Sequence, residues 1–341
     1  MNSRLRPTMV DKTFDIPAFE AQCGGTINLK LAYRVYGELN ATKDNLIVVP
    51  THYGGRSDDV AFLIGEEMAL DPRKYCIVVP NLFGNGVSSS PSNTPAPFAA
   101  NRFPTLTYHD NVVCQRRLIE TVFGVKRLCL VVGFSMGAMQ AYEWATQTPD
   151  RVQRFAAICG SARTYEHNQL FLDSVCTALT TDVAYRDGTY TSPPTRGLEA
   201  FSITYATWFA SQQFYSEQIY RAAGFERMQD VVDLAKLSFM AQDANDLLAM
   251  AATWRAGDPS ANPIYNGDFE KALRSITARG LVMPCESDLY FRVSDNRREV
   301  DYLSNAELAP IQSDYGHLAG AGLDPSAVLF INRKLSELLA S

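Results

Sequence analysis

The sequence lacks the features that mark membrane proteins, nucleic-acid binders and metal proteins. It has no uninterrupted apolar run of about 18 residues, the length that a membrane-spanning helix needs. Lysine and arginine are scattered rather than clustered, and the formal net charge is −6, so nucleic acid is not an expected partner. No group of histidine, cysteine or acidic residues has the spacing of metal ligands, and no phosphate-binding loop motif occurs. We therefore expect no membrane contact, no metal and no cofactor.

The sequence also lacks any sign of paired cysteines. The seven cysteines are scattered, their number is odd, and no Cys-x-x-Cys occurs. Cys76, Cys129 and Cys159 lie in apolar runs, which is typical of buried, reduced thiols. Met1–Pro7 contains arginines but no apolar segment like that of a signal peptide. These features favour a cytoplasmic protein.

What the sequence does contain is a Gly-x-Ser-x-Gly turn after an apolar run. Leu128–Val132 has the composition of a buried strand, Gly133–Gly137 reads Gly-Phe-Ser-Met-Gly, and a helix-like stretch follows. A turn this tight needs small residues on either side of the serine. It leaves the serine Oγ exposed at the carboxyl end of the sheet, beside free N–H groups of the helix. We identify Ser135 as the nucleophile of an acyl-transfer reaction.

Short apolar runs recur along the chain, with helical stretches between them. Those with the length and composition of buried parallel strands are Leu46–Val49, Cys76–Val79, Leu128–Val132, Phe155–Cys159 and Gly280–Met283. Helical patterns lie at about 58–70, 109–123 and 138–148, and Thr13–Phe19 with Ile27–Tyr36 resembles an antiparallel hairpin at the sheet edge. This alternation predicts an α/β fold with a mostly parallel, doubly wound sheet.

The alternation stops between residues 165 and 268, where no strand-like run occurs. Helical patterns follow one another there, at Asn168–Leu179, Leu198–Gln212, Tyr215–Ala222, Met228–Gln242 and Ala244–Arg255. A segment with this much helical pattern is not a loop. We expect residues 165–268 to form a helical lid inserted into an α/β core of residues 1–164 and 269–341. The lid and the loops at the carboxyl ends of the strands would enclose the substrate.

A serine nucleophile needs a base, and the base needs an acid that orients it. Among the four histidines, His317 alone lies well downstream of Ser135. In enzymes with this turn the acid lies between the serine and the histidine, in the loop after a late strand. Glu286 and Asp288 follow the last predicted strand directly, and Asp295 lies further on. Asp288 is the preferred acid, with Asp295 next.

The tetrahedral intermediate of acyl transfer needs two N–H donors aimed at its oxyanion. One is the backbone N–H of Met136, directly after the nucleophile. The second is expected in the loop after Leu46–Val49, which reads Pro-Thr-His-Tyr-Gly-Gly, and we choose the backbone N–H of Tyr53. The paired glycines of that loop allow the backbone to approach a ligand closely.

Further stretches carry a family resemblance that covers nearly the whole chain. They are Phe103–Tyr108, Gly133–Trp144, Ser161–Thr164 followed by Asn168 and Gln169, Asp187–Tyr190, Gly197–Ala200, Asp243–Leu248 and Tyr315–His317. With them the chain resembles the homoserine O-acetyltransferase-like family of α/β-hydrolases. The resemblance implies the α/β-hydrolase fold, a helical lid, a triad of Ser135, His317 and Asp288, and a covalent acyl-enzyme. It also implies a homodimer built through lid helices.

Two positions depart from the transferases of this family. Transferases typically carry Asp directly after the catalytic His, to hold the amino group of homoserine, and this chain has Leu318 there. They also carry an Arg for the carboxylate, and this chain has Phe201. Each charge of homoserine needs a partner in a desolvated pocket, so homoserine is expected to be a poor acceptor. Phe201 and Leu318 are instead expected to line a pocket that suits an uncharged ester.

Together these residues predict a serine carboxylesterase that hydrolyses small short-acyl esters. The alternative is an O-acyltransferase that moves an acyl group from acyl-CoA to an alcohol other than homoserine. Its chemistry is the same up to the acyl-enzyme, and exclusion of water by the lid decides between the two. A third possibility is a non-catalytic binding protein on the same scaffold, against which the intact set of catalytic residue types argues.

Overall fold

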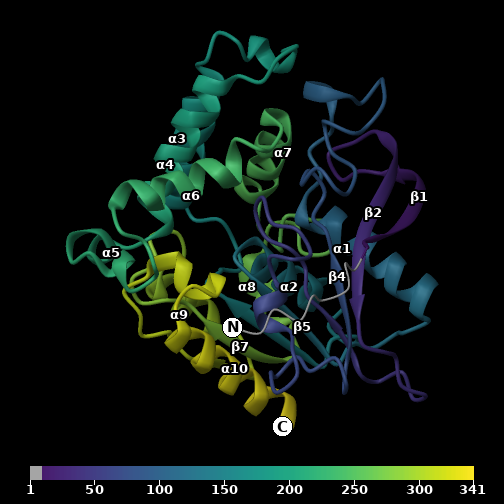
Figure 1. Cartoon of the computed structure of the whole chain (residues 1–341). Helices are drawn as coiled ribbons and strands as arrows, with labels where there is room; N and C mark the ends of the chain where they lie inside the picture. Colours follow the sequence, from purple (N-terminus) through teal and green to yellow (C-terminus); the bar gives the residue numbers. More distant parts are fainter. Residues whose placement is uncertain (1–9) are drawn as a thin grey trace.

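An eight-stranded sheet forms the centre of the computed structural model, which describes residues 10–341 (Figure 1). The strands lie in the order β1-β2-β4-β3-β5-β6-β7-β8. Their bounds are β1 (Lys12–Glu20), β2 (Thr26–Tyr36), β3 (Leu46–Val48), β4 (Cys76–Pro80), β5 (Leu130–Phe134), β6 (Arg154–Ile158), β7 (Arg279–Met283) and β8 (Ala306–Leu308). The pairs β1–β2 and β2–β4 are antiparallel, and all other pairs are parallel. The predicted mostly parallel sheet with an antiparallel hairpin at its edge is confirmed.

The central strands are apolar throughout because helices cover both faces of the sheet. On one face, side chains such as Val48, Val131 and Phe155 pack with α1 (Tyr108–Leu118), α2 (Met136–Gln147) and α8 (Phe269–Arg274). On the other, Ile47, Val132 and their neighbours pack with α10 (Pro325–Ala340). The helix α9 (Val293–Val300) packs against β8. Alternate residues of one strand therefore enter two separate cores, as a doubly wound sheet requires.

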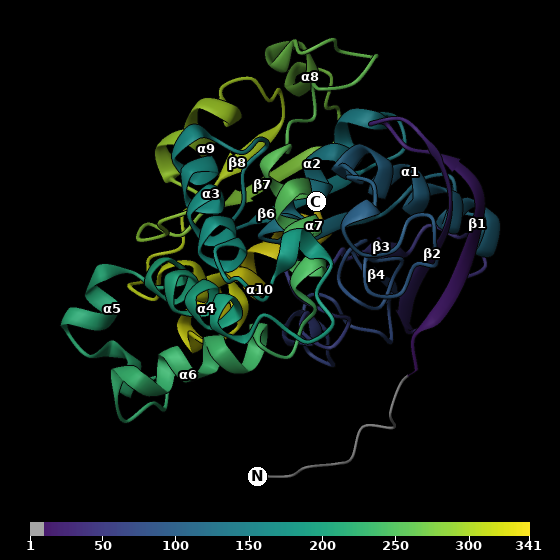
Figure 2. The same ribbon diagram turned by 90° about the horizontal axis from the view of Figure 1, so that it is seen from above.

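The segment between β6 and β7 is helical. It holds α3 (Glu166–Thr180), α4 (Thr195–Phe209), α5 (Gln212–Ser216), α6 (Met228–Phe239), α7 (Ala244–Arg255) and α8. α3 packs on α4 and α7, and α4 packs on α6. Their apolar side chains form a third core, distinct from the two that flank the sheet. Seen from above, α3 to α6 extend away from the β1–β2 hairpin (Figure 2). We refer to residues 165–268 as the lid segment.

Two predicted helices differ from the structure. Residues 58–70 form only the short 3-10 turn Ala61–Leu63, because the N–H of Gly65 bonds to the carbonyl of Leu70 and the chain turns there. The pattern over Tyr215–Ala222 is divided at Gln218, whose φ of +58° is incompatible with a right-handed helix. Within residues 10–341, no helix is long and apolar enough to cross a membrane.

Candidate active site

Ser135 lies between β5 and α2 in a backbone conformation that serine rarely adopts, with φ +57° and ψ −123°. Its N–H donates to the carbonyl of Ile158 on β6 at 2.9 Å. A Cβ on Gly133 would lie 2.1 Å from the carbonyl carbon of Gly137, and a Cβ on Gly137 would lie 2.5 Å from the carbonyl oxygen of Pro50. The turn therefore tolerates no side chain at either glycine. This is the steric reason why the pattern marks the serine.

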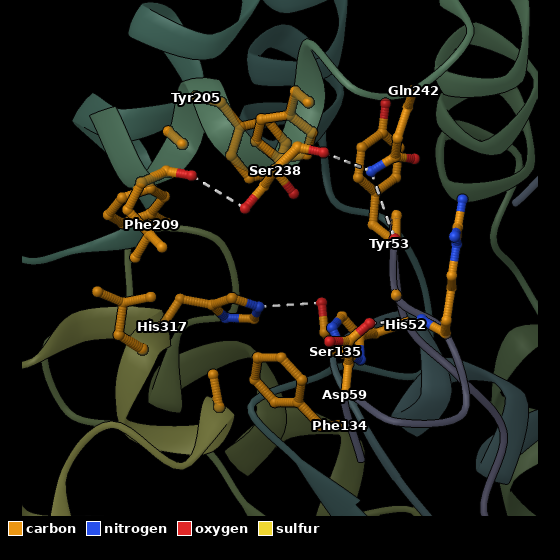
Figure 3. A pocket seen from close by; sticks show the side chains of 18 of the residues that line it. His52, Tyr53, Asp59, Phe134, Ser135, Tyr205, Phe209, Ser238, Gln242 and His317 are labelled. Carbon is orange, nitrogen blue, oxygen red and sulfur yellow. Dashed lines mark hydrogen bonds between the residues drawn. The ribbon is translucent and has the colours of Figure 1, made fainter. Parts of the chain in front are cut away.

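The structure brings Ser135, His317 and Asp288 together, and Figure 3 shows the ring of His317 directed at Ser135. Nε2 of His317 lies 2.9 Å from Oγ of Ser135, and Nδ1 lies 2.7 Å from Oδ2 of Asp288. Oδ1 of Asp288 accepts the backbone N–H groups of Tyr290 at 2.7 Å and Phe291 at 3.2 Å. The side chains of His317 and Asp288 are 7% and 0% exposed, so each orientation is held by protein groups rather than water. The arrangement can carry a proton away from the serine hydroxyl.

The other acids that the sequence offered lie elsewhere. Glu286 is exposed and accepts a hydrogen bond from Gln312. Asp295 belongs to the first turn of α9 and pairs with Arg298 of the same helix. Of the three carboxylates, Asp288 is thus the one that contacts His317.

The two proposed oxyanion donors come from different parts of the chain. Met136 is the first residue of α2, and Tyr53 lies in the loop that follows β3. Among residues 10–341, the backbone N–H of Met136 and that of Tyr53 donate to no protein group. Both N–H groups are therefore available to an oxyanion.

A cavity of about 510 Å³ lies over Ser135 and His317, between the core and the lid segment. In Figure 3 the lid side chains lie above it, and the core side chains lie below. The apolar part of the wall includes Phe134, Tyr205, Phe209, Leu234, Ala235, Phe239 and Leu318. The polar part consists of the loop residues from His52 to Arg56, with Asp59, Ser238 and Gln242.

The two predicted pocket residues differ in their placement. Leu318 lines the cavity and is 9% exposed. Phe201 is 0% exposed and does not line it. Its ring packs on Tyr205 and Phe239, with centroids 5.7 and 5.2 Å apart, and those two rings form the wall. Phe201 supports the cavity from behind, because its position on α4 faces the core of the lid segment.

Several residues that line the cavity were not predicted from the sequence. Tyr205, Phe239 and Gln242 come from lid helices, where aromatic residues at helical spacing indicate a core as readily as a pocket. His52 was noted only as part of its loop, and its ring stands edge-on to Phe134 at 5.1 Å. Burial lowers the pKa of His52 to about 4, so this imidazole adds no positive charge beside the nucleophile at neutral pH. Residues 10–341 contain no cluster of three or more side chains suited to a metal ion.

Comparisons with known proteins place the chain among enzymes of related architecture. Residues 53–207 match the family model of the alpha/beta hydrolase fold. An ethyl acetate hydrolase of Pseudomonas veronii is 43% identical over 91% of this chain and 90% of the relative. A probable esterase of Corynebacterium glutamicum is 35% identical over 97% and 96%. The solved structure of the acetyl esterase MekB matches with a TM-score of 0.95 and 41% identity, covering 97% of both chains. Homoserine O-acetyltransferases are more distant, for example that of Chlorobium chlorochromatii, at 28% identity over 88% of this chain and 87% of the relative.

Proposed function

The chain belongs to the α/β-hydrolase family, and we propose that it is a serine carboxylesterase that hydrolyses small short-acyl esters. The observation that carries this proposal is the continuous contact of Ser135, His317 and Asp288 below the cavity. The hydrolase and esterase relatives at 35–43% identity support ester hydrolysis. Their printed names include ethyl acetate and acetyl esters, which supports a short acyl group.

The reaction follows from the positions of these groups. Oγ of Ser135 attacks the ester carbonyl while Nε2 of His317 takes its proton, and Asp288 stabilises the charge on the imidazole. The backbone N–H groups of Met136 and Tyr53 donate hydrogen bonds to the developing oxyanion. His317 then returns the proton to the departing alcohol. In the second half of the reaction His317 deprotonates a water molecule, which attacks the acyl carbonyl, and His317 then returns that proton to Oγ of Ser135 as the acid leaves.

The cavity wall supports a small, uncharged substrate and water as the acceptor. At one of the two positions where related transferases hold the charges of homoserine, Leu318 presents an apolar side chain to the cavity. At the other, Phe201 is buried behind the aromatic wall. At these two positions a homoserine zwitterion would find no charged partner, and an unpaired charge in a desolvated pocket costs several kcal/mol. The rings of Tyr205, Phe209 and Phe239 limit the space on the lid side.

The proposal is tested by acyl release from ethyl acetate and p-nitrophenyl acetate, for the wild type and Ser135→Ala. We expect steady turnover in water that Ser135→Ala abolishes and that added homoserine does not change. Turnover is expected to fall from p-nitrophenyl acetate to the octanoate. A stoichiometric burst followed by slow turnover, together with acetyl-CoA consumption that depends on an added alcohol, would instead identify an O-acyltransferase.

We also propose that the protein is a cytoplasmic homodimer that associates through lid helices. Exposed apolar side chains on three of these helices support the dimer, namely Leu170 on α3, Ile203 on α4 and Leu237 on α6. All seven cysteines are free thiols, which supports a reducing compartment. Light scattering of the wild type and of Leu237→Glu tests the dimer, which the charged variant is expected to weaken.

A further inference from the structure

The loop after β3 is held at its base by the core. The carbonyl of Thr51 accepts a hydrogen bond from Nε2 of Gln140 on α2 at 3.0 Å. The carbonyl of Gly55 accepts one from Nδ2 of Asn85 at 3.1 Å. These contacts fix where the loop leaves the sheet and where it returns. They do not reach its tip, Tyr53 and Gly54.

The tip of the loop is held by the lid segment instead. The hydroxyl of Tyr53 donates to the backbone carbonyl of Leu247 on α7 at 2.7 Å. The N–H of Gly54 points to Sδ of Met250 at 3.4 Å, and the carbonyl of Gly54 accepts from Nε2 of Gln242 at 3.4 Å. Every hydrogen bond that Tyr53 and Gly54 form within residues 10–341 therefore goes to the segment Gln242–Met250. Figure 3 shows Tyr53 and Gln242 side by side at the edge of the cavity.

The ring of Tyr53 is inserted into the core of the lid segment. Its centroid lies 5.6 Å from that of Tyr205 and 5.8 Å from that of Trp254. Phe201 and Phe239 lie slightly further, at 6.4 and 6.2 Å. The residue as a whole is 6% exposed, although it belongs to a loop of the α/β core. The hydroxyl reaches α7 from the middle of this aromatic cluster.

The chemistry of the site gives a function to the hydrogen bond from the Tyr53 hydroxyl to the Leu247 carbonyl, which we call the anchor. An oxyanion donor lowers the barrier only when its N–H already points to the place where the charge develops. Within the loop, one turn hydrogen bond, from the N–H of Gly55 to the carbonyl of His52 at 3.0 Å, spans the tip. Gly54, with a φ of +65°, and Gly55 give the backbone there more conformational freedom than other residues would. The anchor on α7 removes that freedom at the residue whose N–H is the proposed donor.

We infer that the hydroxyl of Tyr53 is a positioning group that lets lid helix α7 set the geometry of the oxyanion hole. The lid segment then does more than enclose the substrate, because it completes the transition-state site. The inference rests on the proposed esterase function and on Tyr53 as the second donor. It predicts that the acyl-transfer transition state depends on a hydroxyl that no substrate atom touches.

Tyr53→Phe tests the inference because it keeps the ring and removes only the hydrogen bond to Leu247. The Leu247 carbonyl keeps its partner within α7, so no buried acceptor is stranded. We expect kcat for p-nitrophenyl acetate to fall about 10- to 100-fold, somewhat less than the loss of a whole oxyanion donor, with KM nearly unchanged. The inhibition constant of a trifluoromethyl ketone, whose adduct carries an oxyanion, is expected to rise by a similar factor.

Tyr142→Phe is the matched control, since the Tyr142 hydroxyl is buried and has no hydrogen-bond partner in the described chain. It is expected to leave kcat and the inhibition constant unchanged. If Tyr53→Phe fails to fold, Met250→Leu loosens the same tip from the lid side while conserving volume, and a smaller loss of kcat is expected.

The results separate this inference from the proposed function. Wild-type kcat and inhibitor affinity in Tyr53→Phe, with activity still lost in Ser135→Ala, would overturn the positioning role and leave the esterase intact. A rise in KM at constant kcat would also overturn it, because that result indicates a role in substrate binding. Activity that survives in Ser135→Ala would overturn both.

Discussion

Asp288→Asn is expected to alter the tautomer of His317 while leaving the geometry in place. Oδ1 of Asp288 accepts two backbone N–H groups, at 2.7 and 3.2 Å, so the amide oxygen of the variant must take that position. Its NH₂ group then faces Nδ1 of His317, where Oδ2 lies at 2.7 Å in the wild type. An amide NH₂ can only donate, so Nδ1 must accept and the ring proton moves to Nε2.

The expected loss of kcat follows from the proton on Nε2, which prevents His317 from acting as the base. Nε2 lies 2.9 Å from Oγ of Ser135, and a protonated Nε2 cannot take the serine proton. Loss of the correct tautomer in a Ser-His-Asp triad costs about 10⁴ in kcat. At 1.36 kcal/mol for each factor of ten, this is about 5.4 kcal/mol of activation free energy. The Asp288 side chain is 0% exposed, so water does not offer an alternative partner to Nδ1.

The assay is steady-state hydrolysis of p-nitrophenyl acetate, with thermal unfolding as a check on the fold. KM is expected to stay within about a factor of two, because the cavity wall is unchanged. Asp295→Asn is the control, since that carboxyl lies on α9 beside Arg298 and does not contact His317. It is expected to retain nearly full activity. A kcat above about a tenth of the wild-type value in Asp288→Asn would refute the tautomer argument.

Three further changes test other parts of the molecule. Gly133→Ala places a Cβ 2.1 Å from a backbone carbon and is expected to lower thermal stability by several degrees or abolish folding. Gly65→Ala, which meets only a methionine side chain at 3.4 Å, is the tolerated control. Burial raises the pKa of Glu299 to about 7, so the native state retains a proton that the unfolded chain releases above about pH 4.5. The free energy of unfolding in urea is therefore expected to fall as the pH rises from 5 to 7, by about 2 kcal/mol, and Glu299→Gln is expected to remove this slope. An unchanged slope in that variant would assign the pH dependence to other groups. Leu318→Asp adds a carboxylate to the apolar wall and is expected to lower kcat/KM for ethyl acetate about tenfold or more, without creating homoserine acetylation. Phe201 still stands where the transferases carry the arginine that holds the carboxylate of homoserine. Acetyl transfer from acetyl-CoA to homoserine by Leu318→Asp would therefore contradict the argument that this arginine is also required.

Most of the sheet could be predicted because parallel strands buried on both faces are apolar at every position. The strand before the nucleophile was placed two residues early, since Leu128 forms only an isolated bridge with Val152 and the continuous strand begins at Leu130. The helix expected over 58–70 is absent because a turn at Gly65 interrupts an otherwise helical pattern. Gln218 interrupts a second predicted helix because its φ is positive, and a glutamine in the sequence does not predict a positive φ.

Ser135 could be proposed as the nucleophile because all of the requirements of the turn are local. A strand, two glycines and a helix within a short stretch leave one position for a serine, and steric exclusion explains each of them. His317 and Asp288 were proposed from their order along the chain. The loops that carry them follow parallel strands, whose carboxyl ends lie at the same edge of the sheet, so the two residues lie close together. Their distances and their hydrogen bonds came from the structure.

The sequence by itself determined the tight turn that holds Ser135, the mostly parallel sheet and the helical segment between β6 and β7, because each depends on neighbouring residues and on periodicity. Only the tertiary structure decided which aromatic residues face the cavity and which support it from behind. Tyr205 and Phe201 lie one turn apart on α4 and are both aromatic, yet the first lines the cavity and the second does not. The contact of Tyr53 with Leu247 joins residues 194 positions apart in the sequence. Such pairs are set by how the lid segment packs on the core, and no local pattern in the chain records that packing.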